Sequence, residues 1–330
     1  MKNKQVEVIN FFKGISITAI ILYHLIAFYL DVPNIIKIAS NFGGAGVHIF
    51  LFCSGFGLAI SQLNNPLNYN EFIKRRFIKI YIPYILVIFI SFFTPIICEN
   101  NRFIALLSHI FLFKMFNSEY ISSFGMQFWY ISTLFQFYFL FPLLIILNKK
   151  IGDKKFIIFS TLISFLWMLF TSLFNLANNR VFGSFFLQYL WEFSLGIVLA
   201  NNYYNNTYSF MKKISQKEIV IITILSLILF GCTSFFSNFK SFNDFFSFLS
   251  FGGICLLLFN FNILKTIFTY VNKYSYEIYL THILIFEICF NYFNNYINNY
   301  IVAFISIFLL IIISPLYKTF VSKIFFKRYT

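Results

Sequence analysis

Long apolar runs separated by short polar segments dominate the chain. We expect membrane-spanning helices at 14–31, 45–62, 79–98, 128–147, 156–175, 183–200, 218–236, 245–264, 275–293 and 298–317. Each run has about 17 to 22 residues, which is the length that a helix needs to cross the hydrocarbon core of a bilayer. The expected fold is therefore an all-α, polytopic membrane protein with about ten transmembrane helices, formed by one domain over residues 1–330.

The apolar run at 103–113 differs from these segments in its length. It has eleven residues, and a helix of that size is too short to span a bilayer. We expect an interfacial or re-entrant piece of an outer loop. If this run did span the membrane, every later loop would change sides and the charge bias described next would be lost.

The distribution of basic residues orients the chain. With the N-terminus inside, 20 of the 25 lysines and arginines lie in inner segments, and the remaining five lie outside: Lys37, Arg102, Lys114, Arg180 and Lys240. Cytoplasmic loops of membrane proteins carry such an excess of basic residues, so we expect both termini in the cytoplasm. The net charge of +14 then reflects topology and attraction to anionic lipid, and nucleic acid is not an expected partner.

Composition supports this assignment. The chain is 59% hydrophobic and only 11% charged, with a mean hydropathy of +0.78, which excludes an ordinary soluble domain. The abundance of Ile, Asn, Lys, Phe and Tyr is typical of proteins from AT-rich bacterial genomes, so we expect a multi-pass protein of the bacterial cytoplasmic membrane. Five cysteines are scattered through apolar segments without metal-ligand spacing, so we expect neither a metal site nor a disulfide framework.

A lysine and a histidine share one face of the first expected helix. Eleven residues separate Lys13 from His24, which at 100° per residue is about 20° past three full turns and at 1.5 Å per residue is roughly 16 Å. An ionisable side chain at membrane depth marks a functional site by default. The alternative is that Lys13 only anchors the helix end while His24 packs against a neighbouring helix.

A cluster of basic side chains precedes the third expected helix. Arg75 and Arg76 lie four and three residues before Lys79, spacings that gather them on one helix face. Such a face at the cytoplasmic end can bind phosphate groups. It can equally extend to lipid headgroups without binding a ligand.

Other polar residues lie within the apolar runs. Glu192 is expected to be either neutral or paired, and Gln136 needs a hydrogen-bond partner. Tyr279 and His282 share one face of the ninth expected helix. Ser54 begins a small-residue step that allows close approach of either a helix or a ligand.

Five segments, taken in order, resemble the acyltransferase-3 family of integral membrane acyltransferases: KGISITAIILYHL (13–25), GVHIFLFCSGF (46–56), RRFIKIYIPY (75–84), FWYISTLFQFYFLFPLL (128–144) and YSYEIYLTH (274–282). The resemblance implies a bundle of about ten helices that uses cytoplasmic acyl-CoA, commonly acetyl-CoA, to modify a carbohydrate or a lipid-linked glycan. It also implies an essential histidine at His24 with a basic partner at Lys13, and a basic pair at Arg76 and Lys79.

The chain departs from the family pattern at three positions. Lysine stands at 13 and 79, where arginine is frequent, so charge is retained but the bidentate fork is lost. His48 stands where many members have an acidic residue. Some members also carry a soluble esterase-like domain after the last helix, which we do not expect here. Transfer must then be completed within the membrane domain or by a separate protein.

These observations lead to one functional hypothesis and two alternatives. We expect acyl-CoA as co-substrate, with no bound cofactor, its phosphates near Arg76, Lys79, Lys13 and Arg75, and His24 as general base or, less favourably, as acyl carrier. Secondary site candidates are Ser54, Trp129, His282, Tyr279 and Gln136. The alternatives are a polysaccharide or small-molecule transporter or flippase, and an inactive relative of the family. The acceptor, the acyl group and the oligomeric state stay open at this stage.

Overall fold

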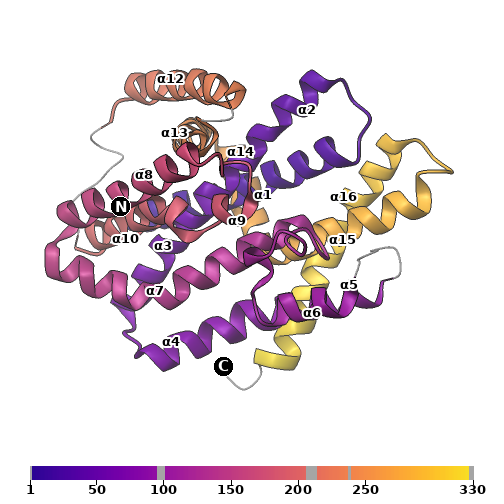
Figure 1. The fold of residues 1–330 in the computed structure, drawn as a ribbon, viewed down its shortest axis with the longest axis horizontal. Coiled ribbons are helices and arrows are strands. Elements are labelled where there is room, and N and C mark those ends of the chain that lie inside the picture. Colours follow the sequence, from indigo (N-terminus) through magenta and orange to yellow (C-terminus); the bar gives the residue numbers. More distant parts are fainter. Residues whose placement is uncertain (1, 95–100, 206–213, 237–238, 327–330) are drawn as a thin grey trace.

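The computed structural model describes residues 2–94, 101–205, 214–236 and 239–326, and these parts of the chain contain helices and no strand (Figure 1). The first half comprises α1 (Lys2–Phe28), α2 (Asn34–Ser40), η1 (Asn41–Ala45), α3 (Gly46–Asn64), α4 (Tyr69–Arg76), η2 (Phe77–Tyr81), α5 (Ile82–Phe93), α6 (Arg102–Ile110), η3 (Lys114–Phe116), η4 (Met126–Phe128) and α7 (Trp129–Ile151). The second half comprises α8 (Asp153–Leu173), α9 (Arg180–Gly183), α10 (Phe186–Tyr204), α12 (Gln216–Phe235), α13 (Lys240–Leu258), α14 (Asn262–Asn272), α15 (Ser275–Phe293), α16 (Asn299–Val321) and η6 (Ser322–Phe326).

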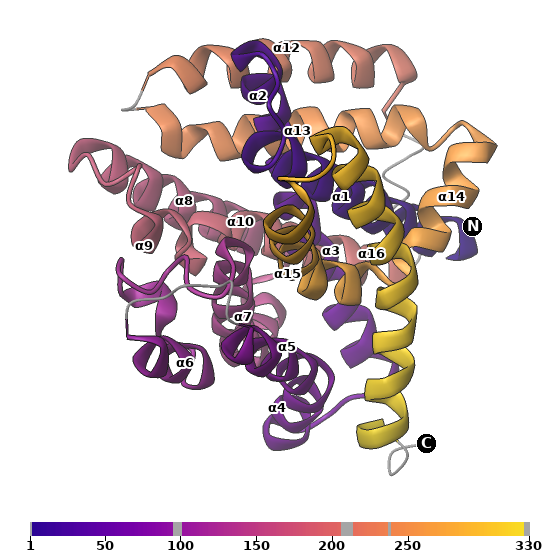
Figure 2. The same ribbon diagram turned by 90° about the vertical axis from the view of Figure 1, so that its right-hand side faces the viewer.

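Nine helical stretches in the described residues are long and apolar enough to cross a membrane. The expected span at 275–293 forms the 19-residue helix α15 but is not among these nine, because Glu277, His282 and Glu287 lower its apolarity. Helix α15 packs against α1, α5 and α16 and lies near the centre of the bundle in Figure 2. The architecture is that of a polytopic all-α membrane protein, as the hydropathy pattern predicts.

Several boundaries differ from the sequence-based expectation. Helix α1 begins at Lys2 rather than at residue 14, so Lys13 lies within a continuous helix and not at its end. The expected outer loop before α3 is mostly helical, because α2 and η1 occupy residues 34–45. The eighth expected span ends at Leu258, and a separate helix, α14, follows. The short run at 103–113 forms α6, which has nine residues and is not one of the nine candidate spans.

Helices α3 and α10 pack at unusually short range. A Cβ atom added to Gly55 would lie 2.2 Å from the carbonyl oxygen of Phe193, and one added to Gly196 would lie 2.2 Å from that of Phe52. Only glycine permits this mutual contact of backbones. The small-residue step after Ser54 therefore serves helix packing, while Ser54 itself faces a cavity described below.

Candidate active site

Two buried histidines from distant parts of the chain meet inside the bundle. The Nδ1 atom of His24 on α1 lies 2.9 Å from the Nε2 atom of His282 on α15. Their rings are stacked, with centroids 5.1 Å apart and planes 18° apart. His24 is 8% exposed and His282 is fully buried. The structure thus brings the first expected site residue together with one of the secondary candidates.

The surroundings of His282 fix the proton positions in this pair. Its Nδ1 atom lies 2.8 Å from the carbonyl oxygen of Tyr279 and 3.2 Å from that of Ile278. Carbonyl oxygens only accept hydrogen bonds, so Nδ1 of His282 carries the proton and Nε2 of the neutral ring is an acceptor. His24 must then donate from Nδ1, which leaves a lone pair on Nε2 of neutral His24. That atom makes no hydrogen bond to any residue that the structure describes.

A cavity of about 400 Å³ collects the basic residues that the sequence singled out. Lys13 of α1, Arg76 of α4 and Lys79 of η2 all line it, together with Ser54 of α3. The three basic residues come from two separate regions of the sequence, so their convergence is a property of the fold. Arg75 is exposed and does not line the cavity.

Arg76 and Lys79 are positioned at the cavity by the local structure of α4 and η2. The guanidinium of Arg76 lies 5.4 Å from the ring centroid of Phe72, and its buried Nε atom has no hydrogen-bond partner in the described residues. Lys79 lies in the π-helical turn η2, a distortion that is frequent at functional sites. The hydroxyl of Tyr276 donates to the carbonyl oxygen of Ile80 in this turn, at 2.6 Å. Helix α15 thus holds the distorted turn in place.

The inner end of the cavity lies next to the histidine pair. Ile20, one helical turn before His24, lines the cavity, as does Tyr279. The ring centroid of Tyr279 lies 6.3 Å from that of His282, and its hydroxyl donates to the carbonyl oxygen of Gln127 at 2.7 Å. His24 itself does not line the cavity, so Tyr279 and Ile20 are the lining residues that lead toward the histidine pair.

Trp129 belongs to a different surface, at the expected outer side. It stacks on Tyr189, with ring centroids 6.1 Å apart and planes 26° apart. The guanidinium of Arg180 lies over the Trp129 ring at 4.9 Å. Neither Trp129 nor Arg180 lines the basic cavity.

Gln136 does not reach the histidine pair or the cavity. Its Oε1 atom accepts from the backbone nitrogen of Phe186 at 3.3 Å, and its Nε2 atom contacts the Met115 sulfur at 3.5 Å. The amide thus has the partners that burial demands, at the start of α10. Its position supports a packing role.

Glu192 is paired with a residue that the sequence did not suggest. Its Oε1 atom lies 2.7 Å from Nδ1 of His48, and Nε2 of His48 lies 3.5 Å from Oδ1 of Asp244. The histidine at position 48 therefore bridges two carboxylates from α10 and α13. The Oε2 atom of Glu192 is buried without a hydrogen-bond partner in the described residues.

Sequence reasoning also missed several tyrosines that form the walls of the basic cavity. Tyr130, Tyr138 and Tyr276 line it beside Tyr279. The sequence offered a weak signal, because Tyr276 and Tyr279 are three residues apart on α15 and face the same side. Tyr130 gave no such signal, because its ring partners Phe50 and Tyr279 lie on other helices.

Taken together, the helical spans, the buried histidine pair and the basic cavity beside it define a membrane enzyme with a site inside its helix bundle. A comparison with protein-family models matches residues 6–319 to the acyltransferase domain of the acyltransferase-3 family. The match covers nearly the whole chain, so the protein belongs to this family and is a membrane acyltransferase. Searches of curated proteins and of solved structures return no match.

Proposed function

We propose that the protein transfers an acyl group, acetyl in the simplest case, from cytoplasmic acyl-CoA to a hydroxyl of a cell-surface or lipid-linked carbohydrate. The observation that carries this proposal is the cavity lined by Lys13, Arg76 and Lys79, which ends one helical turn from His24. Acyl transfer needs an anion-binding donor site next to a base, and this arrangement supplies both. The family match favours this hypothesis over transport without acyl chemistry.

The shape and charge of the cavity suit a coenzyme A thioester. Its phosphates would bind the ammonium and guanidinium groups of Lys79, Arg76 and Lys13 through charge-assisted hydrogen bonds. The flexible arm would extend along the face of α1 toward His24, over a length of roughly 16 Å for eleven helical residues. Arg75, which is exposed and outside the cavity, is not part of this donor site.

The tautomer of the histidine pair supports His24 as the general base. Nε2 of His24 accepts the proton of the acceptor hydroxyl while the hydroxyl oxygen attacks the thioester carbonyl carbon. The carbon–sulfur bond then breaks, the ester remains on the acceptor, and the coenzyme A sulfur leaves with the proton that His24 received. During this step the Nδ1–H of His24 donates to His282, which stabilises the imidazolium.

The exposed guanidinium of Arg180, which lies over the Trp129 ring at 4.9 Å, supports an acceptor site on the outer side. Arg180 adds hydrogen-bond donors for hydroxyl or acidic groups. By the bias of its basic residues, the chain would receive acyl-CoA from the cytoplasm and modify an acceptor at the opposite face of a bacterial cytoplasmic membrane.

The proposal can be tested with purified protein in lipid nanodiscs. Acetyl-CoA is supplied, and release of the coenzyme A thiol is followed with and without envelope glycan fractions. We expect thiol release that depends on Arg76 and His24, with the exposed neighbour variant Arg75→Gln as matched control. Other acyl-CoA thioesters establish the acyl group. Glycan movement across the bilayer without any consumption of acyl-CoA would instead identify a transporter.

A further inference from the structure

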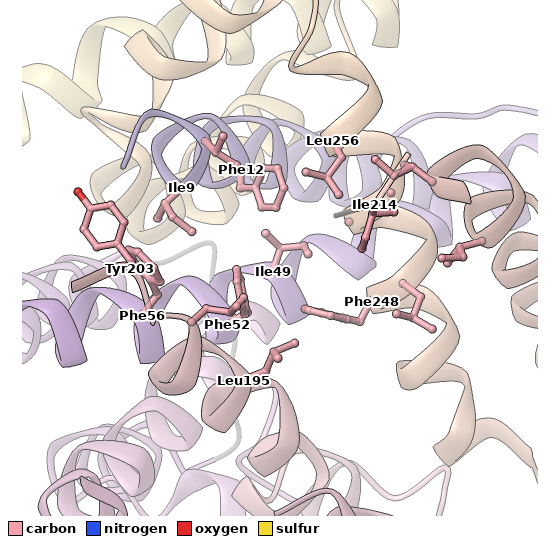
Figure 3. Close-up of a pocket in the computed structure, with 17 residues that line it drawn as sticks. Ile9, Phe12, Ile49, Phe52, Phe56, Leu195, Tyr203, Ile214, Phe248 and Leu256 are labelled. Carbon is pink, nitrogen blue, oxygen red and sulfur yellow. The ribbon is translucent and has the colours of Figure 1, made fainter. Parts of the chain in front are cut away.

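A second cavity, of about 210 Å³, lies on a different side of α1 and α3 from the basic cavity. Its walls come from α1, α3, α10, α12 and α13, and Figure 3 shows Phe12, Ile49 and Phe248 pointing into it. On α1 and α3, which contribute to both cavities, adjacent residues line different cavities. On α1, Phe12 lines the second cavity and Lys13 lines the basic cavity. On α3, Phe52 lines the second cavity and Cys53 lines the basic cavity. The second cavity is therefore separate from the proposed donor site.

The walls of this cavity are apolar almost throughout. Of the side chains that line it, only that of Tyr203 carries a polar atom. Cavities without polar partners do not hold ordered water, but they bind apolar ligands. An occupant must therefore be hydrocarbon.

The position of the cavity shows where such hydrocarbon comes from. Val8 is in the second turn of α1, Ile222 is in the second turn of α12, and Leu256 is in the last turn of α13. By the charge bias these helix ends face the cytoplasm. Helix α12 lies beside α13 and apart from the rest of the bundle in Figures 1 and 2, so a lipid of the cytoplasmic leaflet is the nearest source of hydrocarbon.

Basic residues mark the matching headgroup position. Lys217, in the first turn of α12, is exposed and makes no ion pair within the residues described. Lys212 and Lys213 precede it in the sequence but lie outside the described residues. The nearby Lys265 differs, because it is already paired with Glu7 at 3.4 Å. Basic side chains at a cytoplasmic membrane surface attract anionic headgroups.

We propose that this cavity binds one acyl chain of an anionic phospholipid from the cytoplasmic leaflet, with the headgroup at Lys217. The bound chain fills the space between the α12–α13 pair and the helices α1, α3 and α10. It stabilises the attachment of α12, which makes its main contacts with α13. The site is distinct from acyl transfer and does not depend on the proposed function.

A single glycine allows the cavity to be filled selectively. A Cβ atom at Gly252, which lines the cavity, would meet only the Cδ1 atom of Ile49, at an ordinary contact distance of 3.5 Å. Gly252→Leu therefore places a leucine in the cavity without a backbone clash. The matched control is Gly231→Leu on α12, because a Cβ atom there meets nothing within 4 Å. Both variants add the same side chain to the α12–α13 pair, but only Gly252 lines the cavity.

The test uses nanodiscs that contain phosphatidylglycerol with a photoreactive diazirine in its acyl chain. Crosslinks are mapped by mass spectrometry, and labelling of Phe12, Phe248 and Leu256 is divided by labelling of the exposed positions Leu225 and Leu229. We expect this ratio to fall at least fivefold in Gly252→Leu and to stay unchanged in Gly231→Leu. Unlabelled phosphatidylglycerol should compete with cavity labelling, whereas phosphatidylcholine should not, and Lys217→Gln should remove that preference.

Three results would overturn the proposal. They are absence of cavity labelling in the wild type, a ratio that Gly252→Leu leaves unchanged, and equal competition by the two lipids. Elution as a single species and an unchanged melting temperature in detergent show that Gly252→Leu is folded. If it is not, Leu256→Trp fills the same cavity from α13 and takes its place in the same comparison.

Discussion

The Nδ1 atom of His24 and the Nε2 atom of His282 lie 2.9 Å apart, although 258 residues separate them in the sequence. Because Nδ1 of His282 faces two backbone carbonyl oxygens, the hydrogen bond between the rings has one direction in the neutral pair. His24 donates and His282 accepts. This contact turns the buried histidine of the first helix into a base with its free lone pair on Nε2.

Replacing His282 should slow catalysis without weakening donor binding. In His282→Phe, the Nδ1–H of His24 loses its acceptor and the ring is free to adopt the other tautomer, so we expect kcat to fall by about 10²-fold, within the range usual for acid–base catalysis. The KM for acetyl-CoA should stay within about twofold, since the basic cavity is intact. His282→Gln retains a carbonyl acceptor and should recover part of kcat. If kcat fell and the KM for acetyl-CoA rose together in His282→Phe, and His282→Gln restored neither, the role of His282 would be purely structural.

Removing the charge of Arg76 should weaken donor binding. A lost charge-assisted hydrogen bond to phosphate is worth roughly 1.5–3 kcal/mol, which corresponds to about 10- to 100-fold in the KM for acyl-CoA. The measurement is steady-state kinetics of Arg76→Gln beside Arg75→Gln, whose exposed side chain does not line the cavity. Equal KM values for the two variants would show that these arginines serve lipid headgroups instead.

The pair of Glu192 with His48 should contribute to stability only as a pair. His48→Leu leaves Glu192 buried and uncompensated, which costs about 3–5 kcal/mol in comparable sites. Glu192→Leu costs less, because His48 keeps Asp244 as a partner at 3.5 Å. Glu192→Leu and His48→Leu should each lower the melting temperature in detergent, and the double variant should recover much of the loss. Additive losses in this double-mutant cycle would contradict a direct coupling of the two side chains.

Acid should loosen the segment that follows α6. Burial, and next to it the charge of Lys114, hold the pKa of His109 well below its usual range. Neutral His109 donates from Nε2 toward the Ser123 carbonyl oxygen at 3.0 Å and accepts from the Tyr84 hydroxyl at 2.6 Å. The folded state thus binds fewer protons than the unfolded state, so this stabilisation is complete above about pH 6.5 and is lost as the pH falls. After correction for the pH dependence of intrinsic exchange, the protection factors of residues 111–125 against hydrogen exchange should fall between pH 7.5 and pH 5, and His109→Phe should remove that dependence.

The periodicity of single helices predicted much of the cavity. Lys13 and His24 share a face because they lie on one uninterrupted helix, and Arg76 and Lys79 face the cavity together because they are three residues apart. Arg75 was expected on the same face, but it is exposed. The spacing in the sequence did not distinguish Arg75, which is outside the cavity, from Arg76, which lines it.

Contacts between helices could not be predicted in this way. The partner of Glu192 is 144 residues away in the sequence, and that of His24 is 258 residues away. Helical periodicity relates residues within one helix, so it cannot predict contacts between residues that are so far apart in the sequence. Helix α1 also begins before its apolar run, because backbone hydrogen bonds continue through the polar residues that precede the membrane. The helix α2 was missed because its seven residues are too few to give a clear helical period, and they lie between two apolar runs.

Transfer of label from radioactive acetyl-CoA to cell-envelope glycan tests the role of His24 most directly. Membranes that carry the intact protein are compared with membranes that carry His24→Ala at equal expression and equal melting temperature. The account predicts label in the glycan fraction with the intact protein and a loss of at least 10²-fold with His24→Ala. Full incorporation by His24→Ala would contradict the assignment of His24 as the catalytic base.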